Sequence, residues 1–184
     1  KIENEVFCLL VVGGSQGAKI FDNVVKNAIV NLSKKNKIKI IQQTDKSNTD
    51  NLKNIYDEAE IENTIFDFEE NLADLINQSD LCITRAGAST LAELSIMNKP
   101  FLTIPLVSAK DNHQFENANF YQNLGCCWIM SQKDFNDVNL EKFLDNIITN
   151  KSEYDEKKNN LEKHNFQNSW NDINQKILET INEN

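Results

Sequence analysis

The stretch VFCLLVVGGSQGAKIF, residues Val6 to Phe21, decides how this chain folds. Seven apolar residues are followed by two glycines, a serine, a glutamine, a third glycine and then residues that favour helix. A continuous apolar run of this length is typical of a strand buried on both faces of a parallel sheet. The stretch therefore predicts a strand-turn-helix unit with a glycine-rich corner at the carboxyl end of the strand.

The same alternation of short apolar runs and helical spacing continues along the chain. After a helix at 18–32, we expect strands at 38–42, 64–66, 81–84, 101–104 and 126–130, and helices at 51–60, 70–77, 89–97 and 112–124. Strands that alternate with helices at this interval predict an α/β fold, a Rossmann-like doubly wound parallel sheet covered by helices on both faces.

From Asn139 onward the apolar spacing is helical only. We expect residues 1–150 to form one sheet domain and residues 151–184 a C-terminal helical tail, in which His164 is an ordinary surface histidine. The tail carries a sparse apolar stripe that needs an apolar surface to pack on, in this domain or in a further one. The stripe consists of Phe166, Trp170, Ile173, Ile177, Leu178 and Ile181. Since the chain opens at Lys1 rather than at methionine, it reads as part of something longer.

Length, charge and the lengths of the apolar runs limit the classes of protein to which this chain can belong. A chain of 184 residues that is 40% apolar is long enough for one globular core. Its net charge of -9 disfavours nonspecific binding to nucleic acid or to an anionic membrane surface. No apolar run is long enough to span a bilayer and no secretory pattern opens the chain, so we expect a cytosolic domain. The cysteines lack CxxC pairing and are expected to be structural thiols.

In an open parallel sheet, ligands bind beyond the carboxyl ends of the strands, where loops lead into helix N-termini. The first such corner, GGSQGA, contains Gly14, Ser15 and Gln16. Glycines allow close backbone approach, the serine offers a hydroxyl, and the following helix presents free N–H groups, which together suit a phosphate. The alternative is a tight turn that needs glycine for packing.

The second corner, TRAGASTLAE, spans Thr84 to Glu93 and again leads from a strand through glycine into a helix. Small residues and hydroxyls at Gly87 to Thr90 predict a second anion cradle facing the first. A carboxylate at Glu93, one turn into the helix, can accept hydrogen bonds from a ribose diol, although it can also be a solvated surface residue. Arg85 can pair with phosphate or with a surface acid.

The third corner follows Pro105. Asp111 and Asn112 are natural helix N-caps, and His113, Gln114 and Asn117 then project from the first turns of a helix. Amide and imidazole groups without net charge suit the hydroxyls of a sugar. His113 has no nucleophile or second metal ligand near it in the sequence, so we expect it to position or cap rather than to catalyse.

The fourth corner, FDFEENLADL, ends the third strand and opens a helix with Leu72, Leu75 and Ile76 facing inward. An aromatic ring at Phe68 and exposed backbone at Glu69 can recognise a flat base. The alternative is a loop aromatic packed on the core.

Four motifs in this order and spacing, GGSQGA, the FEENL segment, TRAGASTLAE, and IPL followed by DNHQFENA, resemble the C-terminal half of the MurG family of bacterial glycosyltransferases. The resemblance covers essentially the whole chain. It implies one half of a GT-B fold, in which two Rossmann-like domains face a cleft and the C-terminal domain holds a UDP-sugar donor.

Carried over by position, the resemblance implies that Ser15, Ser89 and Thr90 contact the diphosphate and that Glu93 holds the ribose hydroxyls. The helix N-termini behind Ser15 and Ser89 would then stabilise the negative charge that grows on the leaving UDP.

The resemblance also implies that backbone near Phe68 and Glu69 reads the uracil and that Gln114 with Asn117 holds the sugar. Position 69 is often apolar in relatives, so packing of that side chain on uracil is not implied. The residues expected to bind UDP-N-acetylglucosamine are Gly14, Ser15, Gln16, Phe68, Glu69, Gly87, Ala88, Ser89, Thr90, Leu91, Ala92, Glu93, His113, Gln114 and Asn117.

The activity implied by the family is an inverting, metal-independent transfer of N-acetylglucosamine that converts lipid I to lipid II in peptidoglycan synthesis. The undecaprenyl-linked acceptor, the membrane-associating patch and the catalytic histidine belong to the family's N-terminal domain, which is absent here. We therefore expect no catalytic residue, metal or cofactor in this chain, and no direct membrane insertion. The full-length protein would act at the cytoplasmic face of the inner membrane, with its last helix crossing back to the N-terminal domain.

Three alternatives remain from the residues themselves. The chain can be a stand-alone donor-binding subunit of a split transferase, one half of a UDP-sugar epimerase or hydrolase, or a noncatalytic nucleotide-binding module.

Overall fold

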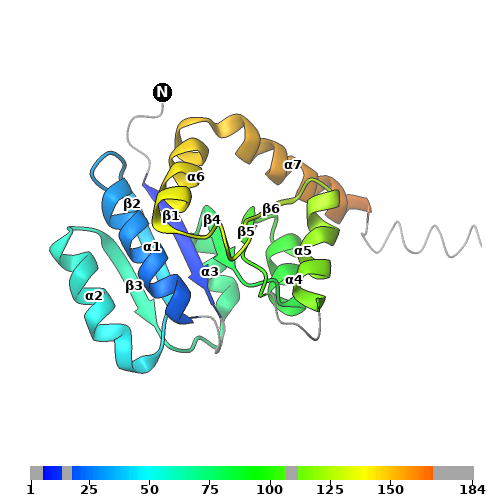
Figure 1. Cartoon of the computed structure of the whole chain (residues 1–184). Coiled ribbons are helices and arrows are strands. Elements are labelled where there is room, and N and C mark those ends of the chain that lie inside the picture. The colour runs from blue at the N-terminus through cyan, green and yellow to red at the C-terminus, as the bar shows by residue number, and fades with distance from the viewer. Residues whose placement is uncertain (1–5, 14–17, 107–111, 168–184) are drawn as a thin grey trace, which may run out of the picture.

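A single parallel sheet organises the computed structural model, which describes residues 6–13, 18–106 and 112–167 (Figure 1). The six strands pair in the order β3-β2-β1-β4-β5-β6, and every neighbouring pair is parallel. Their bounds are β1 Phe7–Val12, β2 Ile38–Gln43, β3 Glu62–Phe66, β4 Leu81–Thr84, β5 Phe101–Thr103 and β6 Cys127–Ile129.

Helices cover both faces of the sheet. Their bounds are α1 Ala18–Leu32, α2 Thr49–Glu58, α3 Leu72–Gln78, α4 Ala88–Ile96, α5 His113–Asn123, α6 Asp137–Thr149 and α7 Lys151–Gln167, with one short turn of 3-10 helix, η1 Lys46–Asn48, before α2. The cluster of buried side chains on one face draws on α1, α2 and α6, and the cluster on the other face draws on α3, α4, α5 and α7. The predicted doubly wound Rossmann-like sheet is confirmed.

Strand β1 shows why its sequence is apolar throughout. Successive strand side chains point to opposite faces of the sheet, so Leu9 and Val11 enter one cluster while Cys8 and Leu10 enter the other. With helices on both faces, neither set reaches water. The expectation of a strand buried on both faces is therefore confirmed.

Strand β4 and helix α1 have the predicted bounds, and the boundaries of the other elements differ from the predicted ones by one or two residues. Strand β3 begins at Glu62 rather than at Thr64, and α2 begins at Thr49, directly after η1. Helix α3 begins at Leu72 rather than at Glu70 because the carboxylate of Glu69 accepts the N–H of Asn71 at 2.9 Å, which makes these residues the turn before the helix.

All four cysteines, Cys8, Cys82, Cys126 and Cys127, are buried free thiols, as expected. Burial raises the pKa of the Cys8 thiol to about 11 and that of Cys127 to about 12. A thiol with so high a pKa stays protonated at neutral pH and behaves as a small core residue.

Helix α7 packs along the sheet domain itself. The Tyr154 hydroxyl donates to the carbonyl oxygen of Asp80 at 2.9 Å, the Asn165 amide donates to the carbonyl oxygen of Ser95 at 2.6 Å, and Leu161 is fully buried. His164, expected to be an ordinary surface residue, is half-buried, with its ring 6.0 Å from that of Phe120. The predicted stripe lies outside the described side chains, and the domain boundary at 150 stays a prediction.

Among the described residues, no helix is both long enough and apolar enough to cross a membrane.

Candidate functional site

The two glycine corners lie next to each other because β1 and β4 are neighbours in the sheet. Val12 is paired with Thr84 at the ends of these strands. The chain leaves β1 through α1 toward β2 on one side, and leaves β4 through α4 toward β5 on the other. This reversal of direction is the topological switch point, the usual ligand crevice of a doubly wound sheet.

The first corner begins at Gly13, which is buried at the end of β1, and leads into α1 at Ala18. The predicted ligand contacts Gly14, Ser15 and Gln16 lie outside the described residues. The first turn of α1 nevertheless starts at the switch point, where its unpaired N–H groups and the positive end of its dipole favour an anion.

The second corner is described in full, and its glycine is not required by the backbone. Gly87 is the N-cap of α4 with φ -68° and ψ 131°, a conformation open to any residue. A Cβ atom built there would have no described heavy atom within 4 Å. Neither strain nor packing against the described residues therefore explains the glycine, and a ligand can approach it without meeting any of those residues.

Helix α4 presents a polar start to this crevice. Its N-cap, Gly87, has no side chain to cap the first N–H groups, Ala88 and Ser89 are exposed, and Thr90 is half-buried. Leu91, in contrast, is fully buried and its N–H donates to the carbonyl oxygen of Gly87 at 3.0 Å, so its side chain serves the core.

Glu93 lies on α4 with an exposed side chain. Its carboxylate makes no hydrogen bond or ion pair with another described residue. A polar ligand in the crevice therefore need not displace any of the described side chains to reach it. Ala92, beside it, is half-buried.

Among the described residues, Arg85 is not paired with a surface acid, and its pairing with phosphate stays a prediction. Its Nη1 donates to the carbonyl oxygen of Ile104 at 2.9 Å and contacts Oε1 of Gln132 at 3.4 Å, while its guanidinium carbon lies 5.1 Å from the ring centroid of Phe21. Burial lowers the pKa of Arg85 from its ordinary value. The ordinary pKa of an arginine is so high that the guanidinium keeps its charge at neutral pH. Arg85 therefore braces the ends of β4 and β5 against α1.

The amide side chains of α5 brace the loops around the second and third corners. Oε1 of Gln114 accepts the N–H of Leu106 at 2.8 Å, and Nδ2 of Asn117 donates to the carbonyl oxygen of Ala86 at 3.1 Å. Nε2 of Gln114 and Oδ1 of Asn117 make no hydrogen bond to another described residue, so each of these groups can serve a ligand. His113 is exposed at the start of the same helix.

Phe68 projects into solvent at the fourth corner, with 72% of its surface exposed, so the alternative of a ring packed on the core is wrong. Its N–H is held by Oδ1 of Asp67 at 2.9 Å, and Gln43 donates to the carbonyl oxygen of Asp67 at 3.2 Å. Strand β3 lies three strand spacings from β4, about 14 Å across the sheet, so this corner is at the far end of an extended crevice.

Sequence reasoning missed a buried polar cluster at the end of β2. Gln42, Thr44 and Asn48 surround the carboxylate of Asp22 on α1. The available signal was the polar triplet Gln42, Gln43, Thr44 after a buried strand, a place where polar side chains need partners. Among the described residues, no group of three or more histidine, cysteine or acidic side chains is arranged to hold a metal ion.

Comparison with known proteins gives this arrangement a context. Residues 8–176 match the glycosyltransferase family 28 C-terminal domain. The chain is 53% identical over 176 residues to the UDP-N-acetylglucosamine--N-acetylmuramyl-(pentapeptide) pyrophosphoryl-undecaprenol N-acetylglucosamine transferase of Pelagibacter ubique, which covers 96% of this chain and 49% of that protein. The chain spans about half the length of the curated relatives it matches.

Solved structures agree in fold. MurG of Acinetobacter baumannii superposes with a TM-score of 0.76 at 26% identity, over 88% of this chain and 46% of that one. The UDP-GlcNAc 2-epimerase of Neisseria meningitidis, solved bound to UDP-GlcNAc, superposes with a TM-score of 0.62 at 16% identity, over 100% of this chain and 46% of that one. The second likeness shows the shared fold alone.

Replacing Gly87 with alanine tests whether that glycine is structural. We expect Gly87→Ala to change the free energy of unfolding by less than about 1 kcal/mol, because alanine fits the backbone and meets no neighbour. Gly125→Ala is the matched control: its φ is +69° and a new Cβ would lie 2.7 Å from Nδ2 of Asn160, so a loss of about 1 to 2 kcal/mol or more is expected. Urea unfolding of both variants decides, and equal losses would show that Gly87 is needed for the fold itself.

Proposed function

This chain belongs to the glycosyltransferase family 28 C-terminal domains, and from that premise we propose that it binds UDP-N-acetylglucosamine as the donor half of an inverting N-acetylglucosaminyltransferase. The observation that carries the proposal is the pair of helix N-termini, α1 and α4, at one switch point. Two such termini side by side suit the two phosphates of a nucleoside diphosphate sugar.

In the proposed complex the diphosphate lies against the starts of α1 and α4, near Ser89 and Thr90 and the predicted contacts Ser15 and Gln16. The open space at Gly87 supports close approach of the ligand to the backbone there. Glu93 accepts hydrogen bonds from the ribose hydroxyls. Its carboxylate is available for them because it has no partner among the described residues.

The two ends of the donor go to opposite corners. The uracil lies toward the backbone of Phe68 and Glu69, where an exposed aromatic ring can add apolar contact. The sugar lies toward α5, where the unused amide groups of Gln114 and Asn117 face hydroxyls, and His113 positions or caps the start of that helix.

The proposed reaction is an in-line displacement. A hydroxyl oxygen of the acceptor attacks C1 of N-acetylglucosamine, and the bond from C1 to the diphosphate oxygen breaks with its electron pair leaving on UDP. Charge then grows on the diphosphate, where the N–H groups and dipoles of α1 and α4 stabilise it without reorganising. The proton lost by the acceptor goes to a base outside this chain.

The acceptor belongs to the other half of the transferase. The Pelagibacter relative is named for a pyrophosphoryl-undecaprenol acceptor, and this chain matches about half of that protein. We therefore place the lipid-linked acceptor site and the catalytic base in a partner domain, with the assembled enzyme at the cytoplasmic membrane face. This chain alone supplies donor binding rather than turnover.

Removing the carboxylate of Glu93 tests the proposed ribose contact. We expect Glu93→Ala to weaken UDP binding by about 1 to 3 kcal/mol, which corresponds to about 5- to 150-fold in Kd, because hydrogen bonds to a charged group are lost. Calorimetric titration with UDP measures this. Glu58→Ala, which removes an exposed carboxylate at the end of α2 that leads into the amino end of β3, should leave Kd unchanged. Unchanged affinity in Glu93→Ala would remove Glu93 from the site.

Asn117 allows the sugar contact to be separated from the brace on the second corner. Asn117→Asp keeps the shape but sets a carboxylate oxygen against the carbonyl oxygen of Ala86, in place of a 3.1 Å hydrogen bond. We expect affinity for UDP and for UDP-N-acetylglucosamine to fall together, each by about tenfold, because the corner that holds the diphosphate moves. The control Asn119→Asp makes the same change on the same helix. If only UDP-N-acetylglucosamine binding fell, Asn117 would act on the sugar alone.

A further inference from the structure

A buried carboxylate lies beneath the first corner, and nothing in the proposed reaction uses it. Asp22, on the second turn of α1, is only 7% exposed. Its Oδ2 accepts hydrogen bonds from the hydroxyl of Thr44 at 2.7 Å and from the amide of Asn48 at 2.9 Å, and its Oδ1 accepts one from the amide of Gln42 at 3.3 Å.

The cluster extends to a fifth side chain. The hydroxyl of Tyr56, fully buried on α2, donates to Oε1 of Gln42 at 2.7 Å, so the amide of Gln42 is held at both ends. Its orientation is thereby fixed, with the nitrogen facing Asp22. In a site of low dielectric such a connected set is costly to disrupt, because each freed group stays buried without a partner. The cluster therefore specifies one position of Asp22 relative to β2.

Fixing Asp22 fixes the start of α1. Asp22 lies four residues after Ala18, the first residue of that helix, so one helical turn separates the cluster from the N–H groups at the switch point. The neighbouring residue, Phe21, packs under the guanidinium of Arg85 at the second corner. The site end of α1 is thus held to β2 on one side and to the end of β4 on the other.

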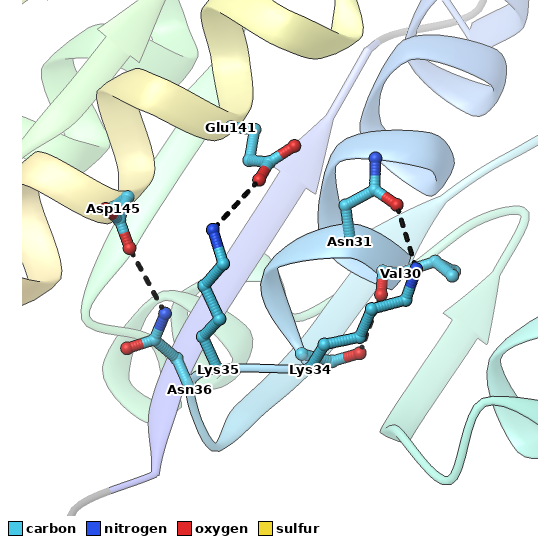
Figure 2. Close-up of polar contacts among 8 residues, drawn as sticks. Val30, Asn31, Lys34, Lys35, Asn36, Glu141 and Asp145 are labelled. Carbon is cyan, nitrogen blue, oxygen red and sulfur yellow. Dashed lines mark hydrogen bonds and ion pairs between the residues drawn. The ribbon is translucent and has the colours of Figure 1, made fainter.

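The opposite end of α1 is held differently. Figure 2 shows Lys35 and Asn36 pointing from the loop after α1 toward Glu141 and Asp145 on α6. The Lys35 to Glu141 ion pair is 3.8 Å long with the lysine side chain 67% exposed, and the Asn36 to Asp145 contact is 3.4 Å long. Such surface contacts are weak. The buried polar anchor of α1 lies at the end that carries the proposed site.

The same strand end also reaches the fourth corner. The N–H of Thr44 donates to the carbonyl oxygen of Phe66 at 2.9 Å, and the side chain of Gln43 donates to the carbonyl oxygen of Asp67. These are separate contacts from the Asp22 cluster, and they hold the loop that precedes Phe68.

We infer that Asp22 is a positioning residue: held by Thr44, Asn48 and Gln42, it sets where the first turn of α1 presents its N–H groups to the diphosphate of the donor. This inference rests on the proposed function. The residue acts through α1, does not touch the ligand, and its role is specific to the phosphate end of the nucleotide.

The variant Asp22→Asn tests this in the full 184-residue chain. Asparagine has the same shape, but its NH₂ group would face the NH₂ group of Gln42 or that of Asn48, neither of which can accept, so the cluster must rearrange. We expect affinity for UDP to fall about tenfold and affinity for uridine, which lacks the diphosphate, to change by less than about twofold. Ligand-observed NMR titration measures both. A merely structural role would lower the melting temperature and weaken both ligands equally.

Two further variants keep the test decisive. Ile29→Val, on the same helix and fully buried, should lower the melting temperature without changing the ratio of UDP to uridine affinity. Thr44→Val removes one hydrogen-bond donor to Asp22 and should lower the ratio of UDP to uridine affinity, by less than Asp22→Asn does. If Asp22→Asn does not fold, the Thr44→Val result tests the inference.

The possible outcomes separate the inference from the proposed function. Wild-type binding of UDP together with an unchanged ratio in Asp22→Asn and Thr44→Val would overturn the inference alone. Tighter UDP binding by Asp22→Asn would mean that the buried charge repels the ligand, which also overturns it. Absence of wild-type binding to UDP and to uridine would overturn the proposed function, and the inference with it.

Discussion

The parallel pairing of β1 with β4 is the constraint on which the rest of the structure depends. It joins segments far apart in the chain, with Val12 opposite Thr84, and so sets the glycine corner after each strand beside the other. Because β2 lies on the far side of β1 and β5 on the far side of β4, α1 and α4 leave this pair in opposite directions along the sheet. The crevice between their N-termini follows from that pairing.

The local field at this crevice opposes the charge of the whole chain. With 28 acidic and 19 basic residues, the molecule repels anions at long range. That repulsion is screened over about 8 to 10 Å at physiological salt, whereas N–H groups in a helix's first turn act at contact distance. A donor with a diphosphate is thus held by short, directed hydrogen bonds, and nonspecific polyanions gain little.

Periodicity predicted the fold well because it depends on burial, which local sequence records. Strand β4 and the helix 18–32 have the predicted bounds, since apolar runs and helical spacing leave few alternatives. Site details were less predictable. Whether Phe68 is exposed depends on what packs around it, and the Arg85 partners, Ile104 and Gln132, come from strands and loops much later in the chain. The polar residues at the end of β2 could indicate that buried partners are needed, but only the packing of α1 against β2 shows that Asp22 is the partner.

The most direct test of the account is calorimetric titration of this chain with UDP-N-acetylglucosamine, UDP-glucose and ADP-ribose, without added metal. The account predicts saturable binding of UDP-N-acetylglucosamine, weaker binding of UDP-glucose, which lacks the acetamido group, and none of ADP-ribose, because the crevice is matched to a uridine donor. Equal binding of all three would indicate a general nucleotide-binding module. Binding of none would contradict the claim that this domain forms the donor site by itself.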